Sequence, residues 1–344
     1  MPKLTSRRSF IHLAAAGGAA AAMPYASRAW AAPAPIVLRC SGSQPADPSS
    51  AHFLWIDRFS SNLKQRVGDR IRVDYFPNGQ LGKEADVVQQ VRLGSIDMMI
   101  TGTSIWATAL PELALLDMGF VFDSWEHVTR AMNGGVGKAF NDMLLQRTGA
   151  SFIAYASHYN SRSVYTKAPL ANVAGLKGLK LRVLPTPIFI ETFKLLGAIP
   201  TPIPINELYT AVQTGVVEGF EHDAGTVLSS KFNEVVKHCL LTEHLFSPVC
   251  TSIGKRAMAK IPPELRAAFQ ESADEASRYQ REMALSKGTE ALATLKAQRM
   301  NFVEVPAADR KLLRDRMQAD LWPSVIKQYP ATQPIMDIIN KTRA

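Results

Sequence analysis

Gly178-Leu179-Lys180-Leu181-Arg182-Val183 reads as a short apolar strand that carries an arginine near its end. Arg162 lies upstream of it. A guanidinium presents its N–H donors in a rigid fork that matches the two oxygens of a carboxylate. Since open α/β sheets place ligands beyond the carboxyl ends of their strands, Arg182 predicts a site for a small carboxylate. The alternative is an ordinary surface arginine beside a strand.

The segments before this strand alternate between strand and helix patterns. Apolar residues recur at helical spacing over 52–67, and Gly94 ends a second helical pattern. Such an alternation predicts an α/β fold with a mostly parallel sheet covered on both faces. The expected strands are 36–40, 71–76 and 96–101, and the expected helices are 52–67 and 84–93.

A second alternation occupies the middle of the chain. Asn206 is a plausible N-cap for one of its helices, and 197–204 reads as an extended, proline-punctuated link. Two α/β halves with strands crossing between them predict a hinged pair of lobes. The expected strands are 152–157, 163–165, 179–184 and 216–221, and the expected helices are 187–196 and 205–214.

A long helical pattern covers 263–297, interrupted only by Gly288. At about 1.5 Å per residue it would span roughly 50 Å, which is enough to run across both lobes. The alternative is a pair of helices kinked at Gly288. Closing helices are expected over 309–329 and 334–342.

Residues 1–31 have the features of an export signal. A basic start with Arg7-Arg8 precedes an apolar run over 11–23, which is too short to anchor in a bilayer, and Ala29-Trp30-Ala31 matches a cleavage site. Ser6-Arg7-Arg8-Ser9-Phe10-Ile11 resembles the twin-arginine signal. These features predict a periplasmic protein that begins near Ala32, with its formal charge reduced from +9 to +5.

Charge and cysteine content exclude several classes of function. The chain has no run of basic residues with interleaved aromatic residues, so nucleic-acid binding is not expected. Metal-ligand spacings are absent from the sequence, and neither a metal nor a cofactor is expected. Cys239 and Cys250 could pair in the periplasm and leave Cys40 over; alternatively, all three are small buried residues.

Several motifs together carry a resemblance to a known family. They are the turn Tyr75-Phe76-Pro77-Asn78-Gly79-Gln80-Leu81-Gly82, Gly94-Ser95-Ile96-Asp97-Met98, the strand from Leu176 to Val183, and Pro200-Thr201-Pro202 followed by the run from Glu207 to Gly219. With these motifs in this order, the chain resembles the periplasmic substrate-binding proteins of tripartite ATP-independent periplasmic (TRAP) transporters, the DctP family. The resemblance covers nearly all of the chain after the export signal.

The resemblance implies a two-lobed, type II-like α/β binding fold with a hinge and a long helix spanning both lobes. Lobe I would comprise 32–159 plus 248–287, and lobe II 160–247 plus 288–344. It also implies a protein that is not an enzyme. A monomer would capture a small organic acid in the interlobe cleft and deliver it to a membrane permease with a small and a large subunit.

The resemblance also implies the site residues. Arg182 falls on the arginine that pairs with the ligand carboxylate, and Arg162 on a second arginine near it. Their mutual repulsion would disfavour an empty closed cleft, so an anion should favour closure. The segments 220–223 and 101–104 depart from the sialate-binding subgroup and are expected to determine which acid binds. The candidate ligand-binding residues are Arg182, Arg162, His222, Glu221, Asp223, Phe220, Thr103, Ser43, Gln44, Glu84 and Trp106, the last of which is alternatively a core residue.

Two other classes of function stay open at this point. A hydrolase or lyase could use His222 as a general base beside Asp223 or Glu221, although no nucleophile motif accompanies them. A sensory binding protein would share the fold and the site and report to a membrane receptor. The ligand itself is also open among a C4-dicarboxylate, a keto or hydroxy acid, an aromatic acid and a uronate.

Overall fold

The computed structural model describes residues 34–343, and the expected export signal lies outside them. One mixed sheet, sheet A, has the strand order β2-β1-β3-β10-β4. Its first three strands are parallel, and β10 runs antiparallel to both of its neighbours. The strands are β1 (Ile36–Gly42), β2 (Ile71–Phe76), β3 (Met98–Gly102), β4 (Ser151–Ser157) and β10 (Pro248–Ile253).

The helices around sheet A follow the apolar spacing of the sequence. Ser50 caps α1 (Ala51–Val67) by accepting a hydrogen bond from the Phe53 amide, and Trp55, Phe59 and Leu63 form its buried face. A π-helical turn, Met132–Val136, joins the fourth and fifth helices. The remaining elements are α2 (Glu84–Leu93), α3 (Thr103–Trp106), α4 (Trp125–Ala131) and α5 (Gly137–Thr148).

The second sheet, sheet B, has the order β11-β9-β5-β8-β6-β7. The predicted link over 197–204 is in part a strand, β7 (Ile199–Pro202), which pairs with β6 (Lys180–Val183) at the edge. Its prolines fit there because an edge strand leaves amides unpaired. The other strands are β5 (Arg162–Thr166), β8 (Gly219–His222), β9 (His238–Leu245) and β11 (Asn301–Glu304).

Short helices follow the strands of sheet B. The prediction that Asn206 caps its helix was wrong, because α7 (Ile205–Gln213) begins after Pro204 and places Asn206 inside its first turn. Proline fits there because the first helical amides have no partner within the helix. The neighbouring helices are α6 (Pro187–Leu195) and α8 (Ala224–Ser229).

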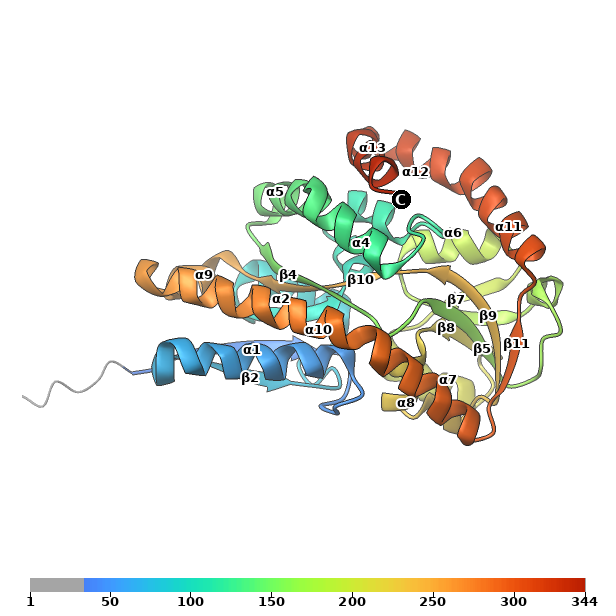
Figure 1. The fold of residues 1–344 in the computed structure, drawn as a ribbon, viewed down its shortest axis with the longest axis horizontal. Coiled ribbons are helices and arrows are strands. Elements are labelled where there is room, and N and C mark those ends of the chain that lie inside the picture. The colour runs from blue at the N-terminus through green and yellow to red at the C-terminus, as the bar shows by residue number, and fades with distance from the viewer. Residues whose placement is uncertain (1–33, 344) are drawn as a thin grey trace, which may run out of the picture. The chain divides into compact units, whose positions relative to one another are not determined.

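The long helical pattern forms one helix, α10 (Pro263–Ala297), which runs past both sheets (Figure 1). It packs against α1 and β4 in its first part and against α8 in its second. Gly288 does not break the helix. A Cβ at this position would collide with the side chain of Asn160, so glycine permits a close approach instead.

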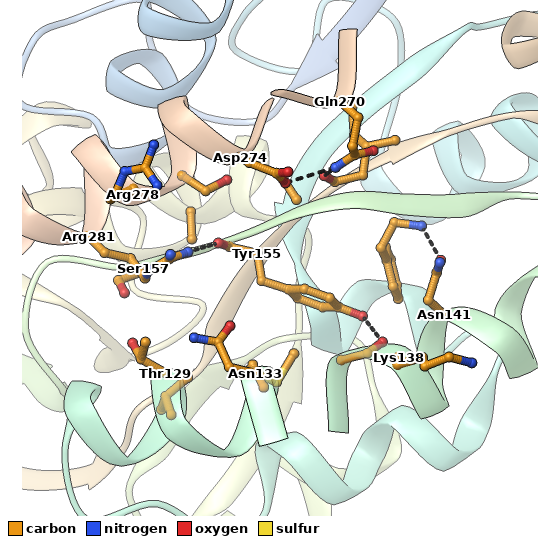
Figure 2. A pocket seen from close by; sticks show the side chains of 18 residues that line it. Thr129, Asn133, Lys138, Asn141, Tyr155, Ser157, Gln270, Asp274, Arg278 and Arg281 are labelled. Carbon is orange, nitrogen blue, oxygen red and sulfur yellow. Dashed lines mark hydrogen bonds between the residues drawn. The ribbon is translucent and has the colours of Figure 1, made fainter. Parts of the chain in front are cut away.

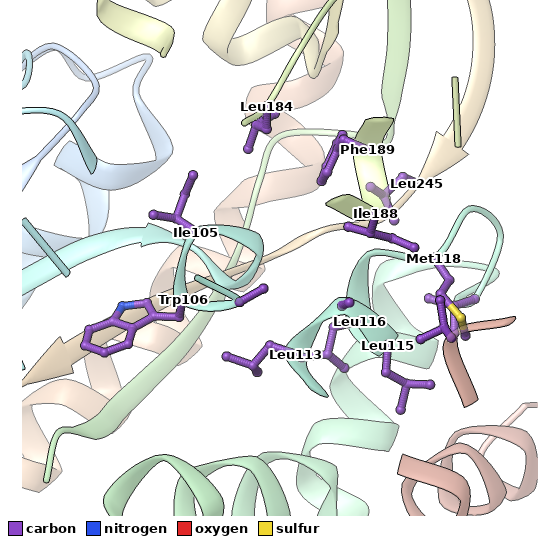
Figure 3. Close-up of a cluster of buried hydrophobic side chains, with 14 of the residues drawn as sticks. Ile105, Trp106, Leu113, Leu115, Leu116, Met118, Leu184, Ile188, Phe189 and Leu245 are labelled. Carbon is purple, nitrogen blue, oxygen red and sulfur yellow. The ribbon is translucent and has the colours of Figure 1, made fainter. Parts of the chain in front are cut away.

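Between the sheets, the chain passes at 158–161, at 246–247 and along α10. A buried cluster after β3 packs against α6, where Ile105, Leu116 and Met118 gather with Ile188 (Figure 3). The last helices contribute buried and partly buried apolar side chains to the same cluster. They are α11 (Ala307–Arg316), α12 (Trp322–Gln328) and α13 (Gln333–Lys341), and a further helix, α9 (Lys255–Lys260), precedes α10.

The three cysteines are free and buried. Cys40 and Cys250 lie in sheet A, whereas Cys239 lies in sheet B. The possible bridge between Cys239 and Cys250 is therefore not formed. Burial raises the pKa of each thiol above its ordinary value, which fits small core residues.

Candidate functional site

A cavity of about 20 Å³ lies between the two sheets, where the predicted arginines meet. That volume is room for about one water molecule, so the two sides are closed on each other. Polar side chains dominate the wall. It is formed by Ser43, Gln44, His52, Glu84, Gly102, Ser104 and Ile105 on the sheet A side, by His158 and Ser247 at the crossings, and by Arg162, Arg182, Leu184, Ile205 and His222 on the sheet B side.

Arg162 is held in a buried ion pair with Glu221 on the neighbouring strand. Its Nε lies 2.5 Å from Oε2 of Glu221 and its Nη2 lies 2.8 Å from Oε1. Burial acts to raise the pKa of Glu221, but the charge and hydrogen bonds of Arg162, with help from His244, lower it to about 2. Glu221 therefore compensates the charge of Arg162 within the protein.

Arg182 has no such partner. Its side chain is 1% exposed, and its Nε donates to the carbonyl of Ile203 at 2.7 Å. Its Nη1 is buried without a hydrogen-bond partner among the described residues. Burial lowers the pKa of Arg182 to about 10, which leaves the guanidinium charged at neutral pH. A buried cation with a free donor favours an anion from outside the protein.

Asp223 organises the polar groups beside the arginines. Its carboxylate caps α8 by accepting from the Thr226 amide at 3.0 Å and from the Thr226 hydroxyl at 2.8 Å. Nδ1 of His222 lies 2.8 Å and Nδ1 of His158 lies 3.2 Å from its Oδ2. Burial opposes the charge of Asp223, yet these partners hold the pKa well below its ordinary value. Burial and then Arg162 lower the pKa of His222 to about 4.

His52 completes a cluster of three imidazoles. The ring centroids of His52 and His158 lie 6.0 Å apart, and those of His158 and His222 lie 5.7 Å apart. His52 is 2% exposed, and neither of its ring nitrogens has a hydrogen-bond partner among the described residues. Burial lowers its pKa well below the ordinary value, so the ring is neutral and offers one donor and one acceptor.

Hydrogen bonds and an ion pair join the two sides next to the cavity. Nε2 of Gln44 donates across to the hydroxyl of Thr226 at 2.9 Å, and Ser50, on the same side as Gln44, orients that amide by donating to its Oε1 at 2.8 Å. At the surface, Nζ of Lys83 lies 2.7 Å from Oε1 of Glu207. Only the Gln44 contact is buried, so it is the stronger of the two.

The structure divides the predicted site residues into three groups. Glu221 and Asp223 lie beside the cavity wall, paired with residues that form it. Thr103, Phe220 and Trp106 do not line it. Phe220 stacks on Tyr165, and Trp106 packs edge-on against Phe152 in the core (Figure 3). The candidates in the wall are Arg182, Arg162, His222, Ser43, Gln44 and Glu84.

Sequence reasoning missed His52, His158 and Ser247, which line the cavity, whereas Ser104 lies in the segment 101–104 that was expected to determine which acid binds. The signal available for His52 was its position after Ser50, a capping residue at the start of a predicted helix. His158 and Ser247 lie where the chain crosses between the sheets, and local patterns do not mark such crossings.

A larger cavity of about 610 Å³ lies along the edge of β4, beside α4, α5 and α10 (Figure 2). Side chains of α10 donate hydrogen bonds to backbone carbonyls on the outer edge of that strand. Gln270 donates to the carbonyl of Ile153 at 2.9 Å and Arg281 to that of Tyr155 at 2.7 Å. None of the predicted site residues lines it, and its polar groups protect an edge strand.

Over residues 34–343, no set of histidine, cysteine, aspartate and glutamate side chains is grouped to hold a metal ion. In the same part of the chain, no helix combines the length and apolar character that crossing a membrane requires.

Comparisons with known proteins agree with this fold. The family model described as bacterial extracellular solute-binding protein, family 7, matches residues 43–328. A solute-binding protein of Roseobacter denitrificans is 32% identical, over 76% of this chain and 80% of its own. The 2,3-diketo-L-gulonate-binding periplasmic protein of Escherichia coli is 29% identical, over 88% of this chain and 91% of its own.

Among solved structures, a TRAP periplasmic solute-binding protein from a Polaromonas species, bound to D-erythronate, superposes with a TM-score of 0.81. It is 26% identical, and the match covers 88% of this chain and 98% of that one.

Proposed function

The chain belongs to the bacterial extracellular solute-binding proteins of family 7, and from that premise we propose that it captures a small organic acid in the cavity between its two sheets. Arg182 is the anchor for the ligand carboxylate, and Arg162 lies beside it with its charge compensated by Glu221. His222, Ser43, Gln44 and Glu84 form the wall around the ligand.

The observation that carries the proposal is that Nη1 of Arg182 is buried and has no hydrogen-bond partner within residues 34–343. A charged guanidinium that is 1% exposed is costly unless an anion pairs with it. Relatives support an acid in that place, since the Escherichia coli protein is named for 2,3-diketo-L-gulonate and the Polaromonas protein holds D-erythronate, each a carboxylate.

Delivery to a TRAP permease with a small and a large membrane subunit is the downstream step that the family favours, with the protein acting as a monomer in the periplasm. The expected export signal supports that compartment. A sensory receptor is the alternative partner with the same ligand site. Co-purification of the chain with the two permease subunits in the presence of ligand distinguishes the permease from the receptor.

Binding proceeds without turnover in this proposal. The alternative of a hydrolase or lyase needs a general base, and His222, which contacts Asp223 through Nδ1, is its candidate, so turnover is tested directly. Prolonged incubation of the protein with its best ligand, followed by mass spectrometry, should recover the ligand unchanged. Any converted product would favour the enzyme.

A calorimetric screen of organic acids tests the proposed function. We expect Arg182→Ala to lose affinity for the best ligand by about 2–5 kcal/mol, or roughly 30-fold to several thousand-fold, because a desolvated charge pair is broken. Lys180→Ala is the matched control, since Lys180 is a cation on the same strand with an exposed side chain. If Arg182→Ala binds as tightly as Lys180→Ala, the anchor is assigned to the wrong residue.

A further inference from the structure

His52 is the second unsatisfied group of the cavity, at a position that neither the sequence motifs nor the comparisons assign. We propose that His52, with His158 and His222 beside it, forms a subsite for uncharged ligand oxygens, and that the protein selects hydroxy- or keto-monocarboxylates over dicarboxylates and unsubstituted acids. This inference rests on the proposed function, in which Arg182 takes the single carboxylate.

The cavity offers a ligand one free cation within residues 34–343. Among the described residues that line the cavity, Arg162 and Arg182 are the cations. Glu221 already pairs with Arg162 through both of its oxygens, so only Arg182 is free for an anion. Once a ligand carboxylate sits on Arg182, the wall holds no further cation for a second one.

Carboxyl groups in and next to the cavity wall would repel a second ligand carboxylate. Glu84 lies in the cavity wall. Asp223 lies outside the wall, in contact with His158, which forms part of it. Asp117 is a further buried carboxyl close by, bonded to Ser247 at 2.6 Å, and burial raises its pKa to about 7, so it carries only part of a negative charge at neutral pH. A second carboxylate would therefore lie near like charges at low dielectric, which disfavours its ionised form and its binding.

His52 has hydrogen-bonding capacity that a ligand can use. A neutral imidazole presents one donor and one acceptor, and both of its nitrogens are buried without a protein partner among residues 34–343. A hydroxyl group can satisfy either nitrogen, and a carbonyl oxygen can accept from the protonated one. A methylene or a benzene ring can do neither, so it would leave the imidazole unsatisfied.

The apolar part of the wall is too small to favour a different ligand. It consists of Ile105, Leu184 and Ile205 among mostly polar neighbours. An alkyl or aromatic acid would place apolar surface against Gln44, the serines and the histidines without returning their hydrogen bonds. The wall therefore fits a ligand that is polar along its length but charged at one end only.

The test uses acids matched in chain length. The four-carbon set is erythronate, butyrate and succinate, and the six-carbon set is gluconate, hexanoate and adipate, titrated into the full-length mature protein by calorimetry. We expect the hydroxy acid of at least one set to bind about tenfold or more tightly than both of its partners. Tighter binding by succinate or adipate would overturn the inference.

His52→Phe keeps a ring and removes both nitrogens, and His238→Phe is the matched control away from the cavity. We expect His52→Phe to reduce the hydroxy-acid preference about tenfold or more, with butyrate or hexanoate affinity little changed, and His52→Gln to restore part of it. Equal losses for every acid in both His52 variants would overturn the subsite.

The outcomes separate the two proposals. If no acid binds the wild-type protein, the proposed function fails along with the inference. If acids bind in a manner that Arg182→Ala abolishes, but without any preference for hydroxyl groups, only the inference fails.

Discussion

The two sides of the cavity differ in how they are built. The sheet B side carries the buried charges: Arg162 pairs with Glu221 and His222 with Asp223, whereas Nη1 of Arg182 has no hydrogen-bond partner among residues 34–343. The sheet A side contributes neutral groups, such as Ser43, and the unpartnered His52, with Glu84 as its charge. The difference indicates that sheet B fixes the electrostatics of the site in advance, while sheet A supplies hydrogen bonds when the two sides close.

Breaking the charge pair of sheet B should have the largest effect. We expect Glu221→Gln to lower the free energy of unfolding by about 3–5 kcal/mol, because it leaves the buried Arg162 without its counter-charge. Urea denaturation of the ligand-free protein measures the loss. In the control Asp142→Asn, the exposed pair with Lys138 is broken, and the change should be within about 0.5 kcal/mol. Equal effects of the two variants would contradict the assignment of a buried, compensated charge pair to the sheet B side.

Lowering the pH should weaken sheet B through its histidine. The pKa of His222 falls from 6.5 to about 4 on folding, so between these values the unfolded chain binds a proton that the folded chain does not. The contribution of His222 to stability, which is fully present above pH 6.5, should therefore decline as the pH falls towards 4, by about 2–3 kcal/mol.

Denaturation midpoints measured across that pH range test the sign and the residue. His222→Gln should remove its part of the decline, whereas His238→Gln, on β9 away from the cavity, should leave that part unchanged. Burial raises the pKa of Asp117 to about 7, which opposes the decline, and lowers that of His52, which adds to it, so the test is the difference between the wild-type and His222→Gln curves. A His222→Gln variant with the same pH dependence as the wild type would refute this prediction. The ion pair of Glu221 does not interfere, because its pKa of about 2 keeps it charged throughout the range.

Removing a contact between the sides should have the smallest effect. We expect Gln44→Ala to weaken ligand binding by about 1 kcal/mol, or roughly fivefold, since it removes the buried bond to Thr226 that forms on closure. Lys83→Ala removes an exposed pair with Glu207 and should cost about 0–0.5 kcal/mol. A larger loss for Lys83→Ala would place the closing contact at the surface instead.

Much of the fold was predictable because its signals are local. Helical spacing predicted α1 and the full length of α10, and alternation predicted β2. Strands β9, β10 and β11 were not predicted, since they are defined by pairing with segments far away in the chain. The segment of edge strand β7 was predicted to be an extended link, because prolines are unusual in strands. Its strand conformation depends on pairing with β6.

The site was predictable in part for the same reason. Arg182 and His222 lie at strand ends that the sequence marks, and both reach the cavity. Phe220 and Trp106 were placed in the cleft by proximity along the chain, yet each turns into the core, because neighbouring residues on a strand or a short helix face different ways. His158 entered the site through a crossing segment that carries no periodic pattern.

The sequence by itself determined that an arginine ends a strand of an α/β protein and that the family motifs surround it. Only the tertiary structure decided which arginine is free. Glu221 lies 59 residues from Arg162 in the chain, and the pairing of β5 with β8 brings them into contact. Charge compensation depends on distances that local patterns do not encode, so the fold alone made Arg182 the open cation and His52 its unsatisfied neighbour.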